Sequence, residues 1–185
     1  QGYYAVRAST STPMLSFEAP AVAVLDRPGP HPELFPFKGV ALCFPQAGPT
    51  LKVPVLVRVP GRFPKYVPDP AQEDVQSADL AVVVRVRNEY QQEVSRLSQH
   101  YQLSSAAAKL DAARTGDILF YRETELPPGR YTVDAVAYDA KSGAASVKSF
   151  PLDVPAPGPS DAVLSSLVVI DHVERVPAAD RDPRN

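Results

Sequence analysis

The stretch Glu125-Leu126-Pro127-Pro128-Gly129-Arg130-Tyr131-Thr132-Val133 decides the predicted fold, because it describes a sharp corner between two strands. Its two prolines fix their φ angles and end the strand before them. Gly129 is expected to adopt a positive φ and turn the chain. Tyr131 then packs on the core and returns a hydrogen bond to the corner, as in the tyrosine corner of Greek-key sandwiches. The stretch therefore predicts a structural corner at Pro128, Gly129 and Tyr131, with an ordinary hairpin loop as the alternative.

On both sides of this corner, apolar and polar residues alternate with a period of two, which indicates strands with one buried face. The clearest alternations cover 51–59 and 80–87. Further strands are expected over 37–44, 93–103, 118–126, 131–138 and 145–154. These seven short strands favour a mainly β chain, an immunoglobulin-like antiparallel β-sandwich, over an α/β fold.

Two finer features of the sandwich follow from the pattern. Val133 occupies the place where an antibody domain has a cysteine, so we expect it to pack against Val82 or Val84 in place of a disulfide. In the last strand, the inward-facing parity changes between Val147 and Phe150, which predicts a β-bulge.

Two short helices accompany the strands. The first is expected over 17–25, with Ser16 as its cap and Pro20 in its first turn. The second follows the serine pair 104–105, which supplies its caps, and ends at Gly116. The 21 prolines of the chain disfavour longer helices.

The chain divides into three predicted parts. Residues 1–34 hold a strand end and the first helix, as a connection from an upstream domain. Residues 35–155 form the sandwich. Residues 156–185 hold a Pro/Gly linker, one more strand over 164–176 and a frayed tail. That strand either joins the sandwich or begins a following unit, and we expect the chain to be a piece of a larger protein.

Composition excludes several classes of function. The net charge of −2 lacks the basic patch of nucleic-acid binders. No stretch approaches the roughly 20 apolar residues that span a bilayer. The single cysteine, Cys43, excludes an intramolecular disulfide and is expected to be a small buried apolar residue.

The titratable residues predict no enzyme, no cofactor and no metal site. Glu123 and Glu125 share a strand face with Tyr121, which is expected to be solvated rather than to form an acid–base pair. The other candidates lack metal-ligand spacing and are expected to be solvated or to cap. They are the histidines His31, His100 and His172, the acidic loop residues Asp69, Glu73 and Asp74, and the run Ser9-Thr10-Ser11, where Arg7 stands in place of the aspartate of a metal-adhesion motif.

Phe63 and Tyr66 lie in the proline-rich loop 60–77 and are the candidate partner-binding residues. Exposed aromatic rings anchor protein partners or stack on sugars. The alternative is that both rings cover one end of the sandwich.

The order of several short motifs resembles the C-terminal β-rich region of bacterial von Willebrand factor A-related proteins. The motifs are Gly2-Tyr3-Tyr4-Ala5, Leu97-Ser98-Gln99, Ile118-Leu119-Phe120-Tyr121-Arg122, Leu126-Pro127-Pro128-Gly129-Arg130-Tyr131 and Tyr138-Asp139-Ala140. The resemblance implies an exported protein, periplasmic or extracellular, in which this region is accessory to an upstream adhesion domain.

We therefore expect a non-catalytic interaction or spacer module, whose partner is another protein or a neighbouring domain of the same chain. A carbohydrate-binding module that uses Phe63 and Tyr66 on a glycan is the alternative.

Overall fold

The computed structural model describes residues 13–156 and 165–167 of the chain. The predicted N-terminal strand end, the Ser9-Thr10-Ser11 run, His172 and most of the expected strand 164–176 lie outside these residues.

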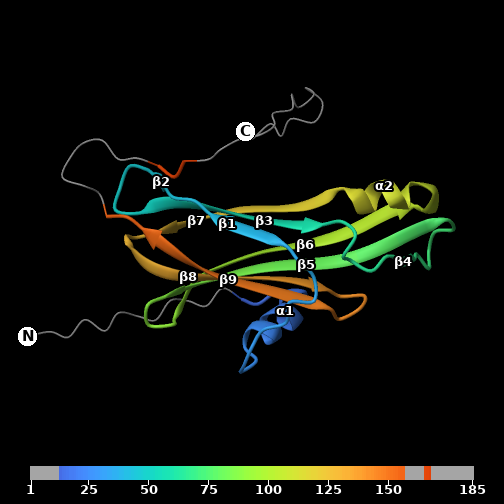
Figure 1. Ribbon diagram of the computed structural model, residues 1–185, viewed down its shortest axis with the longest axis horizontal. Helices are drawn as coiled ribbons and strands as arrows, with labels where there is room; N and C mark the ends of the chain where they lie inside the picture. Colours follow the sequence, from blue (N-terminus) through green and yellow to red (C-terminus); the bar gives the residue numbers. More distant parts are fainter. Residues whose placement is uncertain (1–12, 157–164, 168–185) are drawn as a thin grey trace, which may run out of the picture.

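The described residues form two antiparallel sheets packed face to face, so the predicted mainly β sandwich is confirmed (Figure 1). In the first, here called the β3 sheet, β3 pairs with β7 on one side and with β1 and β2 on the other. In the second, the β5 sheet, the order is β6-β5-β8-β9, and β4 pairs with the first residues of β5. The strands are β1 (Lys38–Ala41), β2 (Phe44–Pro45), β3 (Leu51–Pro60), β4 (Val67–Pro68), β5 (Val75–Asn88), β6 (Glu93–Ala106), β7 (Asp117–Leu126), β8 (Gly129–Asp139) and β9 (Ala145–Val154).

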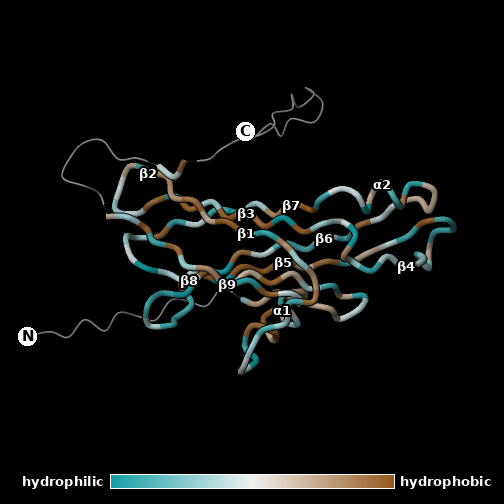
Figure 2. Tube along the Cα trace, in the orientation of Figure 1, coloured by the Kyte–Doolittle hydropathy of each residue, from teal (hydrophilic) through white to brown (hydrophobic). Residues whose placement is uncertain are grey.

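Seven of these strands have four or more residues and match the seven expected ranges, while β2 and β4 have two residues each. The predicted alternation is confirmed by burial: every second residue of 51–59 and of 80–86 faces the core with almost no exposed surface. Hydrophobic residues accordingly follow the middles of the strands (Figure 2). Burial of each such side chain contributes about 1.5–3 kcal/mol. The immunoglobulin-like identity of the sandwich stays a prediction.

The Pro-Pro-Gly corner carries the chain from β7 in one sheet to β8 in the other. The hydroxyl of Tyr131 donates a 2.8 Å hydrogen bond to the carbonyl of Pro127, and its ring is buried. Burial raises the pKa of the Tyr131 phenol.

The expected positive φ of Gly129 is wrong, because the described glycines with positive φ are Gly29, Gly48 and Gly143. Instead, the ring of Tyr131 lies against Gly129, where an added Cβ would stand 3.4 Å from the phenol oxygen. The small residue leaves room for the ring rather than supplying an unusual backbone angle.

Val133 shares the main core with Val82 and Val84, but the comparison with a disulfide position does not hold. β5 and β8 are neighbours in one sheet, and Val133 lies directly opposite Val86. A contact within one sheet cannot replace a bridge between two sheets.

The predicted bulge in β9 is wrong, because β8 and β9 pair in continuous register. Both faces of β9 are covered instead. Ala145 and Val147 pack under helix α1 (Glu18–Leu25), whereas Leu152 and Val154 face the core between the sheets. The apparent change of parity therefore records a second apolar layer and not an extra residue.

Helix α1 lies on the outer face of the β5 sheet, where its apolar residues pack on Val83 and Val136. Pro20 stands in the first turn as predicted, but the predicted Ser16 cap is wrong. The carboxylate of Glu18 instead accepts a 2.8 Å hydrogen bond from the Leu15 amide. At the other end, Arg85 donates to the Leu25 carbonyl at 3.2 Å and fixes the helix to β5.

The second helical segment begins later than expected. The serine pair 104–105 continues β6 and pairs with β5, so these residues are not caps. The backbone groups of 104–105 find partners in the ladder, because β5 begins as early as Val75. A 3-10 turn, η1 (Ala107–Lys109), and helix α2 (Leu110–Thr115) follow and end at Gly116 as predicted.

Candidate site at the open side of the sandwich

The two lateral sides of the sandwich differ. On one side, β6 and β7 are joined by side chains: Tyr101 donates to the Leu119 carbonyl at 3.0 Å, and the hydroxyls of Ser95 and Thr124 lie 2.9 Å apart. On the other side, the edge strands β1 and β9 approach one another, and an added Cβ on Gly39 would lie 3.1 Å from the Phe150 ring. That second side contains a row of hollows.

We call this row the β1–β9 seam. A hollow of about 440 Å³ lies at one end, lined by residues that include Ala41, Cys43, Asp153 and Ser166. A hollow of about 470 Å³ follows between Gly39 and Phe150. The third, of about 310 Å³, is the basic hollow, lined by Pro36, Phe37, Lys38, Arg58, Pro60, Arg62, Asp117 and Lys148. Because Lys38 and Lys148 line both the second and the third hollow, these two adjoin.

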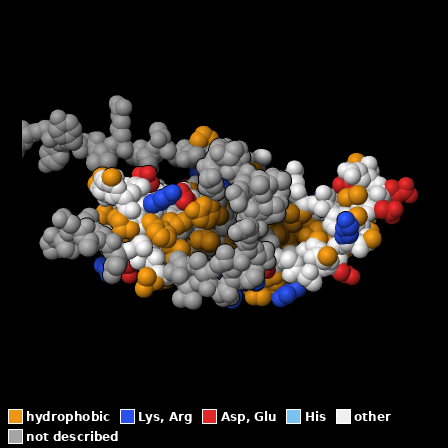
Figure 3. Space-filling model, turned by 90° about the horizontal axis from the view of Figure 1, so that it is seen from above, with side chains coloured by type: hydrophobic (Ala, Val, Ile, Leu, Met, Phe, Trp, Pro, Cys, Tyr) orange, Lys and Arg blue, Asp and Glu red, His pale blue; other side chains and the backbone are white. Residues whose placement is uncertain are grey.

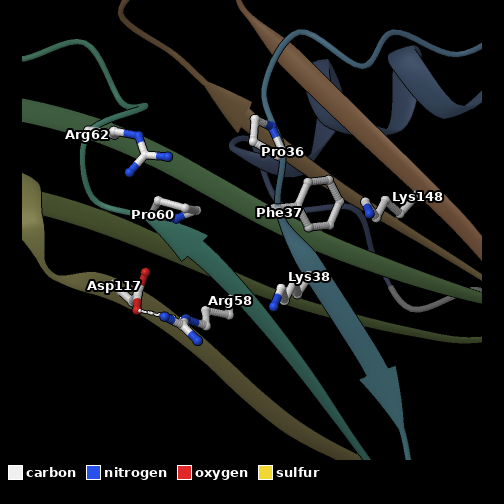
Figure 4. A pocket seen from close by; sticks show the side chains of 8 residues that line it. All are labelled: Pro36, Phe37, Lys38, Arg58, Pro60, Arg62, Asp117 and Lys148. Carbon is white, nitrogen blue, oxygen red and sulfur yellow. Dashed lines mark hydrogen bonds and ion pairs between the residues drawn. The ribbon is translucent and has the colours of Figure 1, made fainter.

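Four cationic side chains surround the basic hollow, and they come from β1, the end of β3, the loop after it, and β9 (Figure 4). Arg58 is neutralised by Asp117, with nitrogen–oxygen distances of 2.6 and 2.7 Å. Lys38, Arg62 and Lys148 form no ion pair with any carboxylate in the described part of the chain. The hollow therefore has three uncompensated positive charges above apolar walls, a combination that suits a carboxylate carried on an apolar segment.

The guanidinium of Arg62 lies 5.0 Å from the centre of the Phe63 ring, which limits the positions open to its charge. Phe63 in turn stacks on Phe35, with ring centres 5.1 Å apart. Of the two predicted partner-binding residues, Phe63 is thus partly buried against the core and helps to position a basic side chain. Tyr66 is half-buried and contacts Arg114, whose guanidinium lies 5.8 Å from its ring centre.

The outer face of the β3 sheet is a second exposed surface. The outer face of the β5 sheet is covered by α1, but Val40, Leu119 and Tyr121 on the β3 sheet remain 45%, 56% and 47% exposed. Viewed from the side on which the β3 sheet lies, hydrophobic side chains gather over the middle of the molecule (Figure 3). This face borders the seam at β1.

The paired glutamates on β7 are engaged with neighbouring side chains. Glu123 pairs with Lys52 at 2.7 Å and accepts a hydrogen bond from Tyr121. The Lys52 ammonium, followed by the Tyr121 hydroxyl, lowers the pKa of Glu123, which is opposite to the shift that a general acid needs. Glu125 accepts a 3.1 Å hydrogen bond from Thr50.

Cys43 is buried as predicted, and burial raises the pKa of its thiol. Its Sγ points to the Asp153 carbonyl at 3.8 Å, across the seam. A thiol of raised pKa forms little thiolate at neutral pH, so this cysteine is not an activated nucleophile.

The described histidines and the acidic loop lie far from one another and from the seam's cations. The prediction of a solvated or capping role is wrong for His100, since its Nε2 lies 2.6 Å from Asp79 and its ring stacks on Phe17. Asp69 accepts a hydrogen bond from the Ala71 amide and holds its own turn. Among the described residues, no group of three or more His, Cys, Asp or Glu could hold a metal ion.

The cations of the basic hollow are not indicated by any sequence motif. Lys38, Arg62 and Lys148 are separated by 24 and 86 positions and belong to no common pattern. Only the approach of β9 to β1 brings them together.

Comparison with known proteins identifies no relative: no family model matches the sequence, and no curated protein matches it. The resemblance to von Willebrand factor A-related proteins therefore stays a prediction. No helix in the part of the chain described here is long and apolar enough to cross a membrane.

Proposed function

We propose that this chain is a non-catalytic interaction module of a larger exported protein, and that its β1–β9 seam binds an extended acidic segment of a protein partner or neighbouring domain. One observation carries the proposal: the open edge of β1 leads directly into a hollow with three uncompensated cations, Lys38, Arg62 and Lys148. Main-chain hydrogen bonds from an added strand supply affinity, and side-chain contacts along it supply specificity. Its role beside an adhesion domain rests on the family resemblance alone.

The acidic character of the partner follows from the electrostatics of the seam. Each solvent-exposed ion pair contributes only about 0.2–1 kcal/mol, so three cations favour an acidic segment modestly and in a salt-dependent way. The larger share of the affinity must come from strand pairing and from apolar contacts.

The test uses a fluorescein-labelled peptide of five Val-Glu repeats, with a Val-Lys peptide of equal length as the control ligand, in fluorescence anisotropy titrations. We expect the Val-Glu peptide to bind at low ionic strength and the triple variant Lys38→Glu, Arg62→Glu, Lys148→Glu to lose that binding. The matched variant Lys65→Glu, Lys109→Glu, Lys141→Glu changes the net charge equally, away from the seam, and should retain it. Equal losses in both variants, or no binding by the unmodified chain, would contradict the proposal.

The glycan-binding alternative receives less support from the geometry. Phe63 stacks on Phe35 and carries Arg62 over its ring, so it offers no open platform for a sugar. Retardation in an affinity gel that contains polysaccharide, abolished by Tyr66→Ala, would favour this alternative over the first.

A further inference from the structure

The outer edge of β1 has backbone groups that point away from its sheet. The Leu42 amide donates to the Pro54 carbonyl of β3 at 3.0 Å, so Leu42 directs its backbone groups toward β3. Antiparallel ladders alternate from one residue to the next, and therefore Gly39, Ala41 and Cys43 direct their N–H and C=O groups outward. Within the described residues, no strand pairs with this outer edge.

The facing edge strand, β9, does not offer an equal opportunity. The Val147 amide donates to the Pro32 carbonyl at 2.9 Å, so the odd-numbered residues of β9 point outward. Pro151 is one of them and has no N–H to donate. A strand that enters the seam therefore pairs with β1.

The first rung of such a pairing already exists. The Ser166 amide donates to the Cys43 carbonyl at 2.9 Å, and the Cys43 amide donates to the Ser166 hydroxyl at 2.9 Å. Ser166 and Cys43 are separated by 123 positions in the sequence, so this contact is tertiary. It delivers the chain to the open edge, directly before the apolar run Leu167-Val168-Val169-Ile170.

We propose that residues 167–171 continue from this contact as a strand antiparallel to β1, so that the chain's own C-terminal segment occupies the seam. The inference rests on the proposed function in treating the seam as a strand-binding site, and it names the occupant. The Ser166–Cys43 contact sets the register: Val169 lies opposite Val40 and Asp171 opposite Lys38.

The sequence of the segment complements this register. Val40 is 45% exposed although it belongs to a strand interior, and Val169 covers it. Lys38 is one of the uncompensated cations of the basic hollow, and Asp171 supplies a carboxylate on the same face of the added strand. An acidic partner segment must then displace this strand, which makes the seam a competitive site.

A disulfide between engineered cysteines tests the register. In a Cys43→Ala background, Val40→Cys with Val169→Cys should form an intramolecular disulfide, because directly opposite Cα atoms lie about 4.5–5.5 Å apart in an antiparallel pair, within disulfide range. The matched control, Val40→Cys with Val168→Cys, differs by one position and places the second thiol on the other face. We expect the first pair to oxidise roughly tenfold faster, as measured by free-thiol mass and by mobility on non-reducing gels.

Equal rates for the two pairs, or no disulfide at all, would overturn the inference, and a disulfide-linked dimer would assign the segment to a second copy instead. The Val-Glu peptide gives a separate readout. Asp171→Lys should strengthen its binding about two- to fivefold, the effect of losing one exposed ion pair, whereas Asp180→Lys should not. Peptide binding without the cross-link would refute only the inference, and the cross-link without peptide binding would refute only the proposed function.

Discussion

Replacing Tyr131 by phenylalanine removes one oxygen atom and one hydrogen bond from the corner between the sheets, and leaves the ring in place. The lost bond is 2.8 Å long and joins the phenol to the Pro127 carbonyl. Pro127 is exposed, so water can reach its carbonyl after the change. The cost is therefore that of a typical net hydrogen bond, about 1 kcal/mol, and not the larger cost of a buried unsatisfied acceptor.

For a domain of this size, a loss of about 1 kcal/mol lowers Tm by roughly 2–4 °C. The measurement is urea unfolding followed by circular dichroism, because the chain has no tryptophan. Tyr90→Phe is the matched control, since the Tyr90 ring is 74% exposed, and it should leave the midpoint unchanged. The m-value should also stay constant, which shows that the change acts on stability and not on compactness.

Two outcomes would refute the reasoning about the corner. If Tyr131→Phe unfolds at the same urea concentration as Tyr90→Phe, the hydrogen bond makes no net contribution. If it loses about 3 kcal/mol or more, the ring itself has lost its packing, and the corner depends on more than the bond.

Three further outcomes are expected. Gly129→Ala should change the free energy of unfolding by less than about 1 kcal/mol, because Gly129 lacks a positive φ and its added Cβ makes an ordinary contact; urea unfolding measures this, and a larger loss would restore the backbone role. Asp134→Ala should cost roughly 3 kcal/mol by the same assay, since it strips a buried carboxylate from Arg87, at 2.7 Å, and from Ser149, at 2.7 Å; a neutral result would show that this network is not stabilising. Cys43 should react with a thiol reagent at least about tenfold more slowly in the folded chain than in urea, because burial raises the pKa of its thiol; comparable rates would mean that the seam opens readily at Cys43.

Local sequence determined the strands and the corner of this protein. The alternation over 51–59 and 80–87 encodes which face of each strand is buried, and that property is fixed by residues two positions apart. The Pro-Pro-Gly-Arg-Tyr stretch likewise contains both partners of its own hydrogen bond, separated by four positions.

Tertiary structure alone decided the features that depend on distant segments. The parity of β9 predicted a bulge, and only the packing of α1 on Val147 showed that both strand faces are buried. The pairing of β6 with an early start of β5 converted two expected helix caps, at 104–105, into strand residues. The seam and its three cations come from strands that approach one another only in the folded chain, and no local pattern records which edges of a sandwich will meet.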